Sequence, residues 1–244
     1  QQGTLNAYLT DAGLEARDRN ARELADAGIE VSLLDAGQVR EVEPALEGVR
    51  GAALYPGDAH VDSLQLVERL AAAAKGHGAR FHEQVEVLRI VRTPGELRIE
   101  TTDGTISAER IVLAAGVWSR RLADDVGAVL PLEGAKGYHV EFGEQETAVR
   151  RPIFLAETRV VATPLAGRLR LAGTLELGTD PDAVDPRRID AVTNAGRSHV
   201  AGLGDARVTG VWRGLRPMSA DGMPIIGRSP QDDRILLATG HGML

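Results

Sequence analysis

One segment of the chain constrains its fold more than any other. Residues 110–115 open with Arg110 and continue as a short, unbroken aliphatic run with β-branched Ile111 and Val112, of the kind that parallel sheets bury on both faces. Gly116 ends this run, and the sequence predicts a helix from Ser119 to Val126 after it. A buried strand that leads through a glycine into a helix is typical of α/β proteins, so we expect a parallel sheet here.

The part of the chain before this unit combines helices with short strands. Asp35 and Asp62 each precede a helical pattern and have the side chain of an N-cap. Gln65 adds a capping-box-like arrangement after Asp62. Short alternating segments separated by turn residues then predict a small β-meander. The expected helices are 5–27, a short one after Asp35 that ends before Pro44, and 63–75; the expected strands are 29–34, 51–55, 79–82, 85–91, 97–102 and 105–108.

From Pro131 onward the pattern changes to successive strands with hairpin signals. This change predicts an α/β (α+β mixed) fold, in which a partial Rossmann-like parallel sheet is joined by a second, mostly antiparallel sheet. We expect three segments, 1–130, 131–212 and 213–244, of which the last returns to the first domain. The expected elements are strands 136–142, 153–156, 159–163 and 168–174, a helix from Pro186 to about Val200 capped by Asp185, a strand at 207–212, a loop rich in glycine and proline, and a last strand at 234–239.

Composition argues against several classes of function. The 244 residues include 28 Lys and Arg against 35 Asp and Glu, and the net charge of −7 disfavours nucleic-acid binding. The absence of cysteine excludes disulfides, thiolate metal sites and cysteine nucleophiles, and the six histidines are too scattered to predict a metal site. The longest apolar stretches are far shorter than the ~20 residues of a membrane helix. Because the chain starts at Gln1 without a methionine and stops where a helix should follow the last strand, we expect both ends to be truncated.

Three glycine-containing segments are candidate ligand sites. In residues 112–119 a buried strand ends in very small residues before a helix, which suits either a flat or phosphorylated ligand or an ordinary strand–helix junction. In residues 214–227 prolines stiffen a loop that starts near Arg216, whose guanidinium suits either a carboxylate ligand or a structural pair with Asp221. Residues 240–243 form a glycine turn that either admits a planar ring or simply reverses the chain.

Taken together, these segments resemble the D-amino acid oxidase superfamily of flavoproteins, most closely its branch of D-amino acid dehydrogenases and glycine oxidases. The resemblance covers nearly the whole chain in the family's order. It rests on Leu113-Ala-Ala-Gly-Val-Trp-Ser119, Pro131-Leu-Glu-Gly-Ala-Lys-Gly-Tyr-His139, Trp212-Arg-Gly-Leu-Arg-Pro217 through Pro224-Ile-Ile-Gly227, and Ala238-Thr-Gly-His-Gly-Met243.

The resemblance implies an FAD-dependent enzyme that oxidises the Cα–N bond of a (D-)amino acid or related amine to an imine, by hydride transfer from Cα to the flavin. Arg216 would anchor the substrate carboxylate while FAD carries the redox chemistry. Tyr138 is a candidate for the substrate-binding tyrosine that residues 157–174 lack, and His241 is a further catalytic candidate. The residues expected along FAD are Val87, Ala115, Gly116, Trp118, Gly214, Gly240, His241, Gly242 and Met243.

The same resemblance assigns roles to the segments. Residues 131–212 would form the substrate-binding domain, and residues 1–130 and 213–244 would belong to the FAD domain. The family's N-terminal glycine-rich loop and its C-terminal helix are absent from this sequence, which therefore looks like a piece of such an enzyme. A non-redox carboxylate-binding module and a non-catalytic subunit of FAD fold remain alternatives.

The resemblance also suggests partners and location. We expect an amino acid or amine substrate and an electron acceptor that is either a quinone or oxygen. A cytoplasmic location is expected, and peripheral association with the inner membrane face stays open. Neither the substrate nor its chirality follows from the residues.

Overall fold

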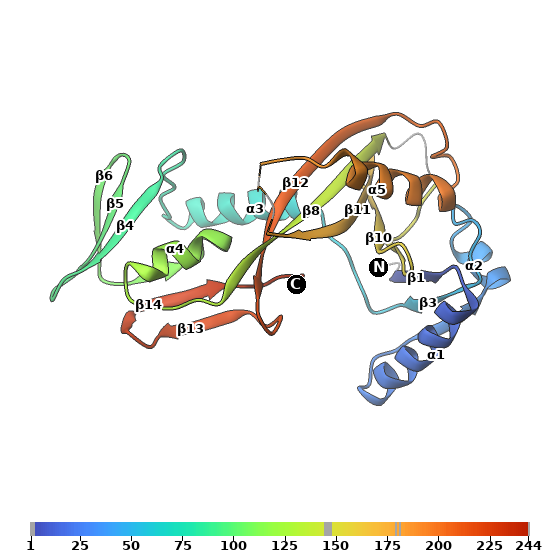
Figure 1. The fold of residues 1–244 in the computed structure, drawn as a ribbon, viewed down its shortest axis with the longest axis horizontal. Helices are drawn as coiled ribbons and strands as arrows, with labels where there is room; N and C mark the ends of the chain where they lie inside the picture. The colour runs from blue at the N-terminus through green and yellow to red at the C-terminus, as the bar shows by residue number, and fades with distance from the viewer. Residues whose placement is uncertain (1–2, 144–147, 179, 181, 244) are drawn as a thin grey trace. The chain divides into compact units, whose positions relative to one another are not determined.

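The computed structural model describes residues 3–143, 148–178, 180 and 182–243 (Figure 1). They form a mixed α/β protein with one large sheet and two small ones, which confirms the predicted fold class. The chain divides into two compact units. Unit 1 consists of Gln1–Glu68, Gly137–Leu175 and Ala183–Arg213, and unit 2 of Arg69–Lys136, Glu176–Asp182 and Gly214–Leu244.

Unit 1 contains most of an eight-stranded sheet with the order β12-β8-β11-β10-β9-β1-β3-β2. Strand β1 pairs in parallel with β9 and antiparallel with β3, so the sheet joins the first segment of this unit to its second. Three strands, β8, β11 and β12, have residues in both units. The strands are β1 (Thr4–Tyr8), β2 (Ser32–Asp35), β3 (Gly51–Tyr55), β8 (Leu132–Gly143), β9 (Ile153–Leu155), β10 (Val160–Leu165), β11 (Arg168–Leu177) and β12 (Val208–Ser219).

The helices begin largely where the sequence predicts them. Each aspartate predicted as an N-cap accepts a hydrogen bond from a backbone N–H of the following turn, which confirms Asp35, Asp62 and Asp185 in this role. Asp62 also accepts a bond from the Arg168 guanidinium, 2.8 Å away, so the start of α3 is tied to β11. The helices are α1 (Asp11–Asp26), α2 (Ala36–Val42), α3 (Ser63–Gly76), which runs from unit 1 into unit 2, and α5 (Pro186–His199).

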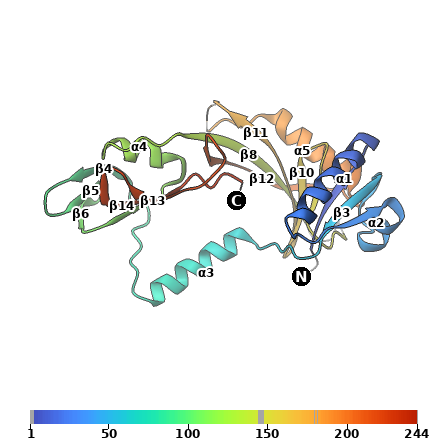
Figure 2. The ribbon, with the colours of Figure 1, turned by 90° about the horizontal axis from the view of Figure 1, so that it is seen from below.

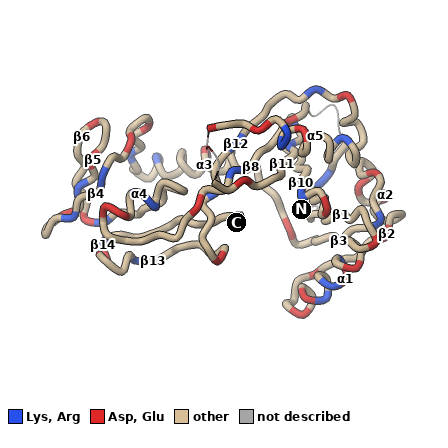
Figure 3. Tube along the Cα trace, in the orientation of Figure 1, with Lys and Arg blue, Asp and Glu red and all other residues tan. Residues whose placement is uncertain are grey.

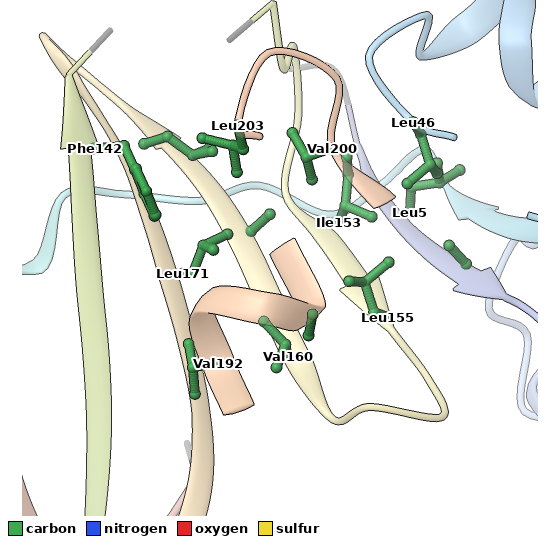
Figure 4. Packing of buried hydrophobic residues seen from close by; sticks show 14 of the residues in the cluster. Leu5, Leu46, Phe142, Ile153, Leu155, Val160, Leu171, Val192, Val200 and Leu203 are labelled. Carbon is green, nitrogen blue, oxygen red and sulfur yellow. The ribbon is translucent and has the colours of Figure 1, made fainter. Parts of the chain in front are cut away.

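The core of unit 1 forms where α5 packs against the sheet (Figure 2). Val192 of α5 lies beside Val160 and Leu171 of the sheet (Figure 4). A Cβ atom at Gly196 would collide with the Leu171 side chain, so a glycine at this position allows the helix to approach. The position of α5 therefore depends on close packing rather than on apolar character alone.

Unit 2 has a smaller sheet in which β14 lies between β13 and β7. Strands β7 and β14 are parallel, as expected for residues 110–115, and a separate three-stranded meander confirms the β-meander prediction. Buried side chains from β7, β14, α4 and the meander form its core. The elements are β4 (Val87–Arg92), β5 (Leu97–Thr101), β6 (Gly104–Ala108), β7 (Ile111–Leu113), the 3-10 turn η1 (Gly116–Trp118), α4 (Ser119–Asp124), β13 (Ile225–Ser229) and β14 (Asp232–Thr239).

Three predictions of local structure are wrong. Thr4–Tyr8 is a strand rather than the start of a helix, because its backbone pairs with two other strands and α1 begins only after the N-cap Thr10. Residues 79–82 pair with no other strand that the structure describes and are irregular. The expected loop 214–227 contains the end of β12 and most of β13, so Arg216 lies on a strand; Pro217 is tolerated because β12 is the edge of its sheet.

The compact units also differ from the predicted division at residues 130 and 212. Residues 1–68 belong to unit 1 together with 137–175, although they were expected in the same domain as residues 110–126. The cause is the pairing of β1 with β9, a contact between residues far apart in the sequence.

Charged residues of both signs are interspersed along the chain, as α1 illustrates (Figure 3). This helix buries only Ala21 and therefore presents most of its length to solvent. No helix among the described residues is long and apolar enough to cross a membrane.

His139 of β8 predicts a dependence of stability on pH. It stacks on Trp212 with 5.0 Å between ring centroids, and burial together with the nearby Arg170 lowers its pKa to about 4. Its pKa in the unfolded chain is about 6.5, so between these values the unfolded chain binds a proton that the folded protein does not. Neutral His139 therefore contributes its full stabilisation above pH 6.5. We expect the free energy of unfolding to fall by roughly 2–3 kcal/mol as the pH decreases from 6.5 to about 4.

Urea unfolding at pH 7.5 and 4.5 measures this effect. His139→Phe keeps an aromatic ring against Trp212 and removes the titrating group, so it should lose less stability on acidification than the parent protein. Equal losses in the two proteins would contradict the assignment to His139.

Candidate functional site

The topology of unit 2 brings two of the predicted glycine turns together. Strands β7 and β14 run in parallel, with Leu113 paired to Leu237, so their carboxyl ends lie at the same edge of the sheet. The Gly116 turn follows β7, and Gly240 follows β14. Ligands of α/β proteins commonly bind at such an edge, outside the carboxyl ends of the strands.

A hydrogen bond links the two turns directly. Thr239, the last residue of β14, donates its hydroxyl to the Gly116 carbonyl oxygen at 2.9 Å. Thr239 is only 1% exposed. The sequence showed a threonine before Gly240 but gave it no role. The available signal was a polar residue directly after the apolar run 235–238.

The end of β12 is attached to the second turn. The Gly242 N–H donates to the Pro217 carbonyl at 3.0 Å, and Met218 forms an isolated β-bridge with His241. Arg216 directly precedes these two residues on β12. All three segments that the sequence singled out therefore meet within unit 2.

The backbone at these turns needs glycine. Gly116, Gly240 and Gly242 have φ angles of +57°, +74° and +55°, in the left-handed region that side chains disfavour. A Cβ atom at Gly242 would lie 3.0 Å from the Met218 sulfur, whereas no heavy atom lies within 4 Å of the position of a Cβ at Gly116. The second turn is therefore packed against β12, while the first turn has open space beside it.

Apolar side chains beside the turns are exposed. Trp118 follows the first turn and is 64% exposed; Met243 follows the second and is 73% exposed. Nearby, a pocket of about 270 Å³ has Val117 and Leu215 in its wall, the chain neighbours of Gly116 and Arg216. Exposed large apolar side chains beside glycine turns are suited to contact with a flat ligand.

Arg216 is a half-buried cation without a partner among the residues that the structure describes. It forms no hydrogen bond or ion pair with any residue that the structure describes, and burial lowers the pKa of its guanidinium. Arginine nevertheless stays protonated at neutral pH. The alternative pairing with Asp221 is not observed, since the Asp221 carboxylate accepts the Met223 N–H instead. A desolvated guanidinium with free donors is suited to bind a carboxylate.

The remaining predicted residues have different surroundings. Ala115 and Val87 both pack against the core of unit 2, and the Val87 carbonyl accepts a bond from Arg121 of α4 at 2.8 Å. Gly214 lies on β12, two residues before Arg216. Tyr138 belongs to unit 1, where it is buried and its hydroxyl accepts the Asp185 N–H at 3.3 Å.

Known proteins are similar to this chain in sequence and in fold. The model of the DAO family, described as FAD dependent oxidoreductase, matches residues 1–244. The chain is 32% identical to a D-amino acid dehydrogenase of Cereibacter sphaeroides, with all of this chain and 57% of that protein aligned. It is 31% identical to a glycine oxidase of Bacillus licheniformis over 86% of this chain and 57% of the relative.

A solved structure extends the comparison to three dimensions. The crystal structure of glycine oxidase from Geobacillus kaustophilus superimposes with a TM-score of 0.92 at 29% identity, covering 98% of this chain and 65% of the other. The chain thus spans 57% of the length of these two relatives and 65% of the solved glycine oxidase. On the match along its whole length, the chain belongs to the DAO family of FAD-dependent oxidoreductases.

Proposed function

We propose that the full-length protein oxidises the Cα–N bond of an amino acid to an imine. The observation that carries this proposal is Arg216, a half-buried guanidinium without a partner among the described residues, next to two glycine turns in a family of FAD-dependent enzymes. The relatives are named D-amino acid dehydrogenase and glycine oxidase. We therefore propose a D-amino acid or glycine as the substrate class.

The residues of unit 2 fit a flavin. The open space beside Gly116 leaves room for a ligand close to the backbone, and exposed Trp118 and Met243 offer apolar surface to a planar ring. We propose that these residues, together with Ala115, Gly214, Gly240, His241 and Gly242, hold FAD, with Val87 contributing backbone contacts. When bound, FAD supplies the group that accepts the hydride.

The protein's own contribution is to bind and orient the substrate. Arg216 would bind the carboxylate by two charge-assisted hydrogen bonds, which are stronger in a half-buried site than in water. Anchoring the carboxylate restricts the orientations that the Cα–H bond can take and so lowers the entropic part of the barrier. Tyr138 and His241 remain proposals as further substrate contacts.

A substrate screen with the full-length protein tests the proposed function. FAD-loaded protein is mixed without oxygen with D-amino acids, their L-enantiomers, glycine and matched primary amines without a carboxylate. We expect loss of flavin absorbance near 450 nm with a D-amino acid or glycine and much slower loss with the amines, because these lack the group that Arg216 binds. Equal rates with and without the carboxylate, or no reduction by any amino acid, would contradict the proposal.

The proposal extends to the electron acceptor that reoxidises the flavin. Reduced protein is exposed either to oxygen, with detection of hydrogen peroxide, or to a soluble quinone. Because the relative from Cereibacter sphaeroides is named a D-amino acid dehydrogenase, we propose the quinone as the faster acceptor. Faster reoxidation by oxygen would instead favour an oxidase.

A further inference from the structure

Thr239 is a polar residue in an apolar row. The buried positions of β14 alternate, and those before Thr239 are Ile235 and Leu237. Valine would fit this pattern and the strand equally well. Instead, the threonine hydroxyl donates to the Gly116 carbonyl oxygen, in a place without solvent access.

This bond restrains a peptide that little else holds. The Gly116 oxygen also accepts the Ser119 N–H, which belongs to the same local turn, whereas Thr239 comes from a different strand. Because a peptide group is planar, fixing the Gly116 carbonyl also fixes the direction of the Val117 N–H. Gly116 has a φ of +57° and open space beside it, so without this bond its peptide is freer to rotate.

Thr239 also connects the two turns, because it bonds to Gly116 of the first turn and directly precedes the second. The second turn is hydrogen-bonded to β12, since the Gly242 N–H donates to the carbonyl of Pro217, the residue after Arg216. A displacement at Thr239 would therefore change the spacing between the Gly116 turn and the Gly240–Gly242 turn. Sites that hold a rigid ligand lose affinity when such spacings change.

We propose that Thr239 is a positioning residue for FAD. Its hydroxyl holds the Gly116 peptide at a fixed position relative to the Gly240–Gly242 turn. The inference rests on the proposed function only in placing FAD beside these two turns. It does not depend on which amino acid is oxidised.

The test compares FAD binding by full-length apoprotein variants, measured by quenching of flavin fluorescence on titration. Thr239→Val keeps the shape and removes the hydroxyl; we expect the dissociation constant of FAD to rise about five- to tenfold, the equivalent of one hydrogen bond. Thr239→Ser keeps the donor and should bind FAD within about twofold of the parent. The flavin absorbance spectrum and reduction potential of the loaded variants provide a second readout, which should shift in Thr239→Val and not in Thr239→Ser.

Ser229→Ala is the matched control. Ser229 lies on β13 of the same small sheet, is 3% exposed, and donates its hydroxyl to the Gln231 side chain at 3.1 Å. Like Thr239→Val, this variant loses one buried hydroxyl. The thermal stability of the two variants should therefore fall by similar amounts, while the FAD affinity of Ser229→Ala stays unchanged. If Thr239→Val does not fold, Thr239→Cys has the size of serine with a much weaker donor and is expected to weaken FAD binding in the same direction.

Unchanged FAD affinity in folded Thr239→Val, or an equal loss in Ser229→Ala, would overturn the proposal. A parent protein that binds no FAD would overturn both this proposal and the cofactor assignment. A parent protein that binds FAD but oxidises no amino acid would contradict the proposed function alone, since the comparison of FAD affinities is then still decisive.

Discussion

Arg216→Met should lower kcat/KM of the full-length protein for its amino acid substrate by about 100- to 1000-fold. Hydrogen bonds to charged groups contribute roughly 1.5–3 kcal/mol each, and a guanidinium can make two of them to one carboxylate. Methionine retains most of the side chain's apolar length, so the variant removes the charge with little change in packing. Because Arg216 has no partner among the described residues, its replacement leaves no described carboxylate unpaired in the protein.

Steady-state kinetics and an FAD titration together test this prediction. Arg216→Lys should recover part of the loss, since lysine supplies charge without the paired geometry. The matched control is Arg228→Met on β13, where the guanidinium is exposed and donates to the Asp233 carbonyl at 3.0 Å; its kcat/KM should remain near that of the parent. FAD affinity should be retained in all three variants. A kcat/KM within a factor of three of the parent for Arg216→Met would remove Arg216 from the substrate site.

Lys136→Met is expected to lower the free energy of unfolding by roughly 3–5 kcal/mol, the usual cost of removing one member of a buried ion pair. The Lys136 ammonium lies 3.3 Å from a Glu176 carboxylate oxygen, and the two side chains are only 3% and 8% exposed. The same ammonium donates to the Asp180 carbonyl at 2.7 Å. Removing the cation therefore takes the positive charge away from a nearly buried carboxylate and removes a donor from the Asp180 carbonyl.

Chemical denaturation of the single and double variants measures the coupling. Lys136→Met combined with Glu176→Leu removes both charges and should recover much of the lost stability, because the desolvation cost disappears with them. Arg120→Met is the control for an exposed pair: Arg120 and Glu133 are 3.9 Å apart, and both are more than half exposed. We expect a loss of at most about 1 kcal/mol there. If the free energy of unfolding fell no more in Lys136→Met than in this control, the result would contradict a stabilising role of the buried pair.

Local structure in this protein is largely encoded by neighbouring residues. Asp35, Asp62 and Asp185 cap helices because an aspartate can bond the N–H groups two and three residues ahead, an interaction contained within one turn. The strand before Gly116 and the meander were equally predictable from alternation and turn residues. The same local logic failed at Thr4–Tyr8, where helical spacing is overridden by pairing with β9, about 150 positions later in the chain.

The candidate site shows a similar division. Glycine turns and an arginine near prolines were visible in the sequence, and so was the resemblance that suggested FAD. Arg216 lies on a strand, lacks a partner among the described residues, and is followed by two residues that contact the His241 turn. These features depend on the path of β12, which no local pattern specifies. The role of Thr239 was also hidden, because its partner Gly116 is 123 positions earlier in the chain.

The sequence by itself thus determined the caps, most of the strands, the glycine turns and the family, since these depend on residues within a few positions or on motifs in a fixed order. The tertiary structure decided which of those pieces meet. The parallel register of β7 and β14 places the Gly116 and Gly240 turns at one edge, and burial leaves the Arg216 charge half-desolvated beside them. Both results arise from long-range backbone pairing and packing, whose energies depend on the whole of unit 2 rather than on any single segment.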